Sequence, residues 1–369
     1  MVNSRKNKPV KNVVKVLVQA LATFSIMATA LPISSEEVWF IRVFDFPRMQ
    51  IFSLALLCLV VLLLLRLWHR KRDKLLLSAL IVALVYQAIN IFPYTPLAST
   101  TVLQADANAP QSTQLSIMVV NVYMENTEHI RLIKMVKKWN PDILVTLESD
   151  LRWQKGMRPV TRNYPFKIEI PLSNTYGMHL YSQLPLRQDT VRYLLDKDIP
   201  SIKTYVLLRN NKWVELHAVH PKPPVPTEDG NSKKRDAEIV MVGREVAKSK
   251  YPVLVLGDFN DVAWSHTSSL FQEVSGLLDP RIGRGFYNTF NANYPFLRWP
   301  LDHVFHSNHF KLLRLERLPF IGSDHFPVFI SLNYASDNKF DQSKTQPDED
   351  THEEATDAVK EGKEEARED

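Results

Sequence analysis

Eight polar residues with the side chains used in acid-base and metal chemistry lie at or close to the ends of apolar runs: Asn121, Glu148, His220, Asp258, Asn260, Asp302, Asp324 and His325. The clearest case is the stretch 253–261. Its four apolar residues predict a buried strand, and Gly257 then permits a tight turn that delivers Asp258 and Asn260 at the strand's carboxyl end. That end is where an open α/β sheet places its chemistry. An Asp and an Asn after a strand also form ordinary turns, so the other six residues are what favours a site.

Carboxylates and an amide predict a metal site. Glu148 closes the apolar run 143–147, so its carboxylate can reach the same sheet edge as Asp258. With Asn121 on a neighbouring strand and Asp324 approaching, the set offers hard oxygen ligands. Such ligands suit Mg²⁺ or Mn²⁺ rather than Zn²⁺.

Two histidines set the expected reaction type. His325 opens the last apolar run from a turn, and pairing with Asp302 would hold it in one tautomer and keep it protonated beside a phosphate. His220 is the second candidate, but His217 lies only three residues before it. On a strand these two point to opposite faces, so one of them reaches the site, and the strand-end position favours His220.

The segment 114–335 carries the elements that must position these residues. Strand patterns at 115–122 and 142–148 flank a helical pattern at 127–139, which predicts neighbouring strands joined by a crossover helix. A hairpin is expected at 204–208 and 213–219 around Asn210-Asn211, followed by a helix over 232–249. Further strands are expected at 301–305, 310–318 and 326–332.

The first 92 residues predict a membrane region with three helices. Apolar segments at 13–31, 51–68 and 75–92 each approach the roughly 20 residues that a spanning helix needs. The first could instead be a signal peptide cleaved near Ala28-Thr29-Ala30. Basic residues precede the first segment and crowd the junction between the second and third. The positive-inside rule then predicts a multi-pass protein of the cytoplasmic (inner) membrane, with the domain on the periplasmic side.

Composition bounds the rest of the chain. Residues 1–100 hold 12 Lys and Arg against four Asp and Glu, whereas residues 336–369 hold 13 acidic against five basic residues. We expect 93–113, rich in Pro, Ala, Ser, Thr and Gln, to be a linker, and 336–369 to be a disordered acidic tail. The single cysteine, Cys58, excludes a disulfide or a Cys-based metal site within one chain.

Seven blocks in chain order resemble the endonuclease/exonuclease/phosphatase superfamily, in a membrane-anchored bacterial form. They are the Asn121 strand, Leu147-Glu148, 176–182, His220-Pro221, Gly257-Asp258-Phe259-Asn260, Leu301-Asp302-His303 and 323–327. The resemblance implies a four-layer α/β sandwich, two mixed sheets flanked by helices, after the transmembrane helical region. It also implies a hydrolase that cleaves a phosphate ester with a divalent metal.

The resemblance also assigns roles by position. Glu148 resembles the main metal ligand, supported by Asn121 and Asp324. Asp258 resembles the carboxylate that activates the attacking water, and Asn260 the amide that holds a phosphate oxygen.

The two histidines complete the implied site. His325, paired with Asp302, resembles the histidine that stabilises the phosphorane, and His220 the residue that assists from the other side. Phosphoryl transfer needs charge neutralisation and positioned water more than covalent chemistry, which agrees with this set.

The substrate is left open between two kinds of phosphodiester, nucleic acid and a phospholipid head group. The sequence departs from the family at His303, where an aromatic residue is common, and at Arg298, which stands two positions before the usual basic residue. An alternative reading is a catalytically silent membrane protein that uses the fold as a binding module. Carboxylates that repel one another without metal argue against it.

Overall fold

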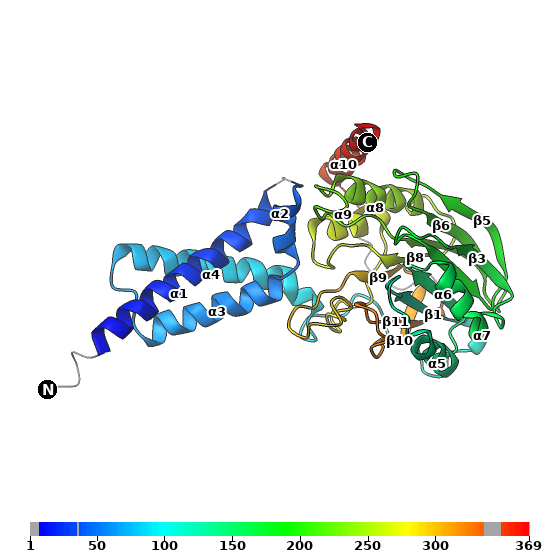
Figure 1. The fold of residues 1–369 in the computed structure, drawn as a ribbon, viewed down its shortest axis with the longest axis horizontal. Coiled ribbons are helices and arrows are strands. Elements are labelled where there is room, and N and C mark those ends of the chain that lie inside the picture. The colour runs from blue at the N-terminus through cyan, green and yellow to red at the C-terminus, as the bar shows by residue number, and fades with distance from the viewer. Residues whose placement is uncertain (1–6, 35–36, 336–347, 369) are drawn as a thin grey trace. The chain divides into compact units, whose positions relative to one another are not determined.

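The computed structural model describes residues 7–34, 37–335 and 348–368. The chain forms two compact units, Met1–Pro93 and Tyr94–Asp369 (Figure 1). Each unit has its own core, and each is described separately.

Helices make up the first unit: α1 (Asn7–Ala30), α2 (Trp39–Arg42), α3 (Arg48–Leu64) and α4 (Lys71–Ile91), with 3-10 turns at Leu31–Ile33 and Val43–Asp45. Two segments, Lys11–Ile33 and Lys71–Tyr94, are long and apolar enough to cross a membrane. A third span results if the helical segments Trp39–Asp45 and Arg48–Leu64, which are bent by 71° relative to each other, count as one. The predicted segment 51–68 is helical only to Leu64, because Arg66 takes a positive φ of 49° and turns the chain.

Charged side chains inside this helical unit are paired. Lys15 Nζ lies 2.6 Å from Asp73 Oδ2, and Gln19 donates to the same carboxylate at 2.8 Å. Near the start of α3, Arg48 pairs with Asp45 at 2.6 Å. Pairing of this kind neutralises charge that an apolar surrounding would otherwise penalise.

The second unit contains a six-stranded mixed sheet. Its strand order is β10 (Phe310–Arg317), β11 (Val328–Tyr334), β1 (Gln114–Asn121), β2 (Ile143–Leu147), β4 (Met178–Ser182) and β3 (Phe166–Ile170). Strands β1 and β2 are parallel and joined through α5 (His129–Trp139), whereas the other pairs are antiparallel.

A five-stranded sheet faces it, in the order β5 (Leu186–Arg192), β6 (Ser201–Leu207), β7 (Trp213–Val219), β8 (Val253–Asp258) and β9 (Asp302–His306). Strands β6 and β7 form the predicted hairpin. The crossover helix α8 (Lys233–Val246) makes β7 and β8 parallel.

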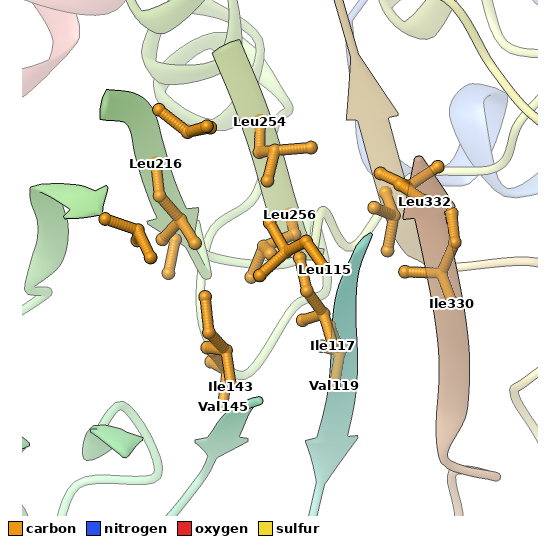
Figure 2. Close-up of a cluster of buried hydrophobic side chains, with 14 of the residues drawn as sticks. Leu115, Ile117, Val119, Ile143, Val145, Leu216, Leu254, Leu256, Ile330 and Leu332 are labelled. Carbon is orange, nitrogen blue, oxygen red and sulfur yellow. The ribbon is translucent and has the colours of Figure 1, made fainter. Parts of the chain in front are cut away.

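Apolar side chains from both sheets meet in one core. Figure 2 shows Ile117 and Val145 of the first sheet facing Leu216 and Leu256 of the second. A second core lies between the first sheet and α5, α6 (Leu151–Gly156) and α7 (Arg158–Thr161), and a third between the second sheet, α8 and α9 (His266–Ser275). The expected four-layer sandwich of two mixed sheets flanked by helices is therefore confirmed.

The expectation of a free linker over 93–113 is wrong for its second half. Val102 is fully buried in the core between the sheets, and Ala105 N donates to Leu312 O at 2.8 Å. Leu312 N in turn donates to Leu103 O at 2.9 Å. The segment also includes 3-10 turns at Phe92–Tyr94 and Gln111–Thr113. These apolar insertions outweigh the polar composition that suggested a linker.

The expectation of a disordered tail is wrong for Glu349–Glu368, which form helix α10. Residues 336–347 and 369 of the predicted tail lie outside the described residues. Asp348 is described and directly precedes α10. Ala355 and Val359 of α10 pack against Val240, Leu270 and Val274 of α8 and α9. Burial of this narrow apolar strip gives the charged segment a reason to fold.

Candidate active site

Both parallel strand pairs end at the same edge of the sandwich. Asn121 ends β1, and Glu148 follows β2 in the first sheet. Asp258 ends β8 in the second sheet, directly opposite Asp302 at the start of β9. With His220 after β7 and Asn260, Asp324 and His325 in the adjoining loops, these eight residues are called the edge cluster below.

Unusual backbone conformations deliver three residues to this edge. Gly257 has a φ of +141°, and a Cβ at that position would lie 1.9 Å from Val219 O, so only glycine fits. Glu148 and Asn260 have left-handed φ values of 55° and 50°. Such conformations persist where the surrounding structure imposes them, and they gather at functional sites.

The Asn121 amide joins the two sheets. Its Nδ2 donates to Glu148 Oε1 at 2.8 Å and to Asp258 Oδ2 at 3.0 Å. Its Oδ1 accepts from Tyr123 N at 3.0 Å. In this orientation Asn121 holds two carboxylates together, and a half-turn of the amide would present Oδ1 to them instead.

His325 lies between two carboxylates. Its Nδ1 is 2.8 Å from Asp302 Oδ2, and its Nε2 is 3.4 Å from Asp258 Oδ2. Burial opposes protonation, but the charges of Asp302 and Asp258 prevail and raise the pKa of His325 to about 10. Ligand atoms of these three residues lie within 4.8 Å of one another. Because a protonated imidazole cannot bind a metal, we interpret the triplet as an imidazolium held by two carboxylates.

Ser323 fixes the turn that carries His325. Its hydroxyl donates to Asn121 O at 2.8 Å and accepts from His325 N at 3.0 Å. The ring of Phe290 lies 4.9 Å from that of His325. Sequence reasoning did not select either residue; Ser323 lies inside a recognised block, whereas nothing in the sequence pointed to Phe290.

His220 is a neutral histidine at this edge. Burial lowers the pKa of His220 to about 4, although the Asp258 charge opposes the shift. Its Nε2 is 4.0 Å from Asp258 Oδ2, and its buried Nδ1 has no hydrogen-bond partner within the described part of the chain. Tyr176 packs on it with ring centres 5.3 Å apart and donates to Glu228 at 3.0 Å.

Asn260 is held on three sides. Its backbone N donates to Asp258 Oδ1 at 2.9 Å, and its Nδ2 donates to Pro221 O at 2.9 Å. Arg235 of α8 donates to Asn260 O at 2.9 Å. The amide therefore lies between the Asp258 and His220 turns.

The edge cluster fits a divalent cation. Burial raises the pKa of the Glu148 carboxyl to about 7; the Asn121 hydrogen bond opposes this, while the charges of Asp324 and Asp258 add to it. Burial also raises the pKa of Asp324. Within residues 7–34, 37–335 and 348–368, no Lys or Arg lies at ion-pair distance from Glu148, Asp258 or Asp324. Hard oxygen donors with uncompensated negative charge are what Mg²⁺ or Mn²⁺ prefers.

A second buried cluster lies between the second sheet and α8. This α8 cluster comprises Arg192, Lys203, Glu215, His217 and Glu245. His217 Nε2 is 2.8 Å from Glu215 Oε1, and Lys203 Nζ is 3.1 Å from Glu215 and 2.6 Å from Glu245. Arg192 pairs with Glu245. Of the two candidate histidines, His220 thus lies at the edge and His217 in a separate ionic network.

His303 is a core residue. It stacks between Phe259 and Phe305, with ring centres 4.7 and 5.2 Å apart. Arg281 donates to its Nδ1 at 2.7 Å, and its Nε2 lies 2.9 Å from Asp261 O. The sequence departs from the resembled family's pattern at His303, and this departure therefore lies in the core.

Comparisons with known proteins agree with this geometry. The model of the Endonuclease/Exonuclease/phosphatase family matches residues 118–325. No curated protein matches the sequence.

Three solved structures resemble the chain, each with a TM-score of 0.50. D. rerio TDP2 humanized by 14 mutations is 12% identical, over 60% of this chain and 99% of that one. The human Nocturnin catalytic domain with bound sulfate is 15% identical, over 62% and 96%. A functionally unknown protein from Enterococcus faecalis is 13% identical, over 60% and 100%. At these identities the likeness concerns the fold.

Proposed function

We propose, because the chain belongs to the endonuclease/exonuclease/phosphatase family, whose members hydrolyse phosphate esters, that this protein is a metal-dependent phosphodiesterase. We further propose that its substrate is a nucleic acid or a phospholipid head group, and that it works outside the cytoplasm as a multi-pass protein of the inner membrane.

One observation carries this proposal. The Asn121 amide brings the carboxylates of Glu148 and Asp258, from different sheets, to 2.8 and 3.0 Å from one nitrogen, beside a histidine whose pKa is about 10. A fold without chemistry at this edge has no physical need to hold like charges together.

Each residue has a task in hydrolysis. Asp258 orients the attacking water and accepts its proton. The carboxylate is held in place by Asn121, which donates to its Oδ2, and by His325, whose Nε2 lies 3.4 Å from the same oxygen. His325, kept cationic by Asp302, donates toward the charge that grows on the phosphorane oxygens. His220 has an unpartnered Nδ1 in the described structure and is neutral, so it can donate to or accept from the substrate. Asn260 holds a phosphate oxygen with the amide hydrogen that Pro221 leaves unused.

Glu148 and Asp324, with Asn121 after a turn of its amide, would hold Mg²⁺ or Mn²⁺. Such an ion supplies charge neutralisation at the phosphate oxygens. The raised pKa of Glu148 supports this assignment, because a bound cation would offset both the burial and the neighbouring carboxylate charges that raise it.

The apolar helices support a membrane location. Two or three of them are long and apolar enough to span a bilayer. The basic residues in front of α1 and between α3 and α4 favour the orientation with the second unit outside.

The test uses the full-length protein in detergent with Mg²⁺ or Mn²⁺. Supercoiled plasmid, single-stranded oligonucleotide and a choline phospholipid are supplied in parallel, each with Asp258→Asn and His325→Ala controls. We expect one substrate to be cleaved, EDTA to stop the reaction, and both variants to be inactive. Absence of cleavage together with no metal-induced rise in melting temperature would favour the binding-module reading instead.

A further inference from the structure

A hollow of about 450 Å³ lies between the segment 284–288 and the end of β10, residues 315–317. Arg284 and Arg317 line it together with the rings of Phe286 and Tyr287. Glu316 also lines it, and this carboxylate is paired with Arg314. The lining therefore combines two cations, unpaired within the described chain, with flat apolar surface.

The hollow adjoins the edge cluster through Thr289. This residue follows Asn288 of the lining, and its hydroxyl accepts from Asp302 N at 3.2 Å. Its carbonyl accepts from Phe326 N at 2.9 Å, and Phe326 directly follows His325. Thr289 thus links the lining of the hollow, through these hydrogen bonds, to the segments that carry Asp302 and His325.

A third arginine extends the positive charge toward the site. Arg298 and Arg317 both lie over the Phe326 ring, with guanidinium carbons 4.8 and 4.5 Å from its centre. Arg298 donates to Ala292 O at 3.1 Å, while Ala292 N donates to Asp324 O at 2.6 Å. Arg317 donates to Asn288 O at 2.9 Å. Backbone carbonyls thus fix both guanidinium groups and leave other N–H donors.

These arginines have no acidic partner among the described residues, unlike their neighbour Arg314, which pairs with Glu316 at 2.5 Å. Burial, and then the nearby charge of Arg298, lowers the pKa of Arg317. Two cations held against one ring without a carboxylate repel each other, and an anion bound beside them would reduce that repulsion.

We infer that Arg298 and Arg317, with the hollow beside them, form a second anion subsite that binds a phosphate of the substrate other than the one hydrolysed. The inference rests on the proposed phosphodiesterase function and deepens it. The preferred substrate then carries at least two phosphates, which a choline phospholipid does not. A polynucleotide and a diphosphate lipid share this chemistry.

The experiment compares matched substrates with the full-length protein in detergent and Mg²⁺. Dithymidine monophosphate is compared with the same dinucleotide carrying terminal 5′- and 3′-phosphates, and phosphatidylglycerol with diphosphatidylglycerol. The measured quantity is the ratio of kcat/KM within each pair. We expect a ratio of about ten in one pair, as charge-assisted hydrogen bonds to a phosphate allow, and the responding pair identifies the source.

Variants assign that ratio to the subsite. Arg317→Gln is expected to reduce it to near one, and Arg317→Lys to restore part of it. Lys167→Gln removes a positive charge from exposed β3, at the opposite end of the same sheet, and should leave the ratio unchanged. Ratios near one in both pairs for the unaltered protein, or equal ratios in the Arg317→Gln and Lys167→Gln variants, contradict the inference while the proposed function stands.

Failure of the proposed function can be distinguished from failure of the subsite inference. If no substrate is cleaved, binding of pyrophosphate in EDTA is measured by calorimetry. Weaker binding by Arg317→Gln than by Lys167→Gln then supports the subsite, and equal binding refutes it.

Discussion

The edge cluster and the α8 cluster both mix buried with half-buried residues, and both contain two carboxylates and a histidine within 4.8 Å of one another. They differ in charge balance. In the α8 cluster Lys203 and Arg192 neutralise Glu215 and Glu245. In the edge cluster, within the described part of the chain, His325 is the one cation that pairs with the carboxylates of Asp258 and Asp302, and Glu148 and Asp324 have no cationic partner there. Composition alone therefore does not separate a functional site from a structural network; uncompensated charge does.

Exchange of one histidine in each cluster should give the largest contrast. We expect His325→Gln to lower kcat by about 10³-fold, because it removes a cation next to the reacting phosphate. His217→Gln should leave kcat within about twofold, since His217 hydrogen-bonds to Glu215 and Arg192 of the α8 cluster and not to the described residues of the edge cluster. Steady-state kinetics, on the substrate that the cleavage assay described above identifies, measure both values of kcat. A large loss of kcat in a well-folded His217→Gln protein would remove the distinction between the clusters.

Metal binding should separate the clusters as well. EDTA is expected to abolish activity, and Mg²⁺ to raise the melting temperature of the metal-free protein through binding to the native state. Glu148→Gln should remove this rise, whereas Glu245→Gln, in the compensated cluster, should retain it. The comparison fails if both variants lose the rise or neither does.

Replacing a glutamate by the uncharged glutamine should change the free energy of unfolding in opposite directions in the two clusters. In EDTA at pH 8, Glu148→Gln is expected to stabilise the fold, because burial raises the pKa of Glu148 to about 7 and the folded state prefers the neutral group. Glu215→Gln should destabilise it by about 2 kcal/mol, since it removes the carboxylate charge that Lys203 and His217 bind and leaves Glu245 as the remaining carboxylate of the α8 cluster. Urea unfolding measures both changes, and the same sign in both variants would contradict the charge-balance argument.

The smallest effect should appear at low pH. Burial opposes ionisation of Glu215, but hydrogen bonds from His217, Ser249 and Lys203 prevail and lower its pKa to about 2 from an ordinary value of 4.5. Its ionised form therefore stabilises the fold above about pH 4.5, and this contribution is lost as the pH falls toward 2. Unfolding midpoints between pH 5 and 2 should fall less steeply for Glu215→Gln than for the unaltered protein. Parallel curves would show that Glu215 is not responsible.

The sequence predicted strand positions where apolar runs are continuous. The run before Gly257 became β8, and the crossover pattern around α5 appeared as expected. Edge strand β5 was missed because its middle residues are exposed and polar, so no alternation is visible. Helix α10 was missed because its apolar strip, Ala355 and Val359, is diluted by acidic residues.

The eight residues selected from the sequence meet at one edge of the sandwich, but their bonds could not be predicted. The sequence placed Glu148 and Asp258 at one sheet edge, whereas Asp258 reaches Asn121 and Glu148 from the second sheet. Nothing in the sequence said that the Asn121 amide would point its nitrogen at two carboxylates, or that His217 would join an ionic network. Such details depend on side chains from distant strands, which periodicity does not register.

The Asn121 amide spans the seam between two sheets whose facing sides pack mainly through apolar side chains. The two carboxylates keep their separation only while the sheets keep their mutual alignment. A slide of one sheet over the other, by repacking around Leu256 for example, would pull the carboxylates apart before any strand melts. The proposed catalytic rate therefore depends on the relative position of the two sheets. A small change deep in the sandwich should lower this rate before any spectroscopic signal of unfolding changes.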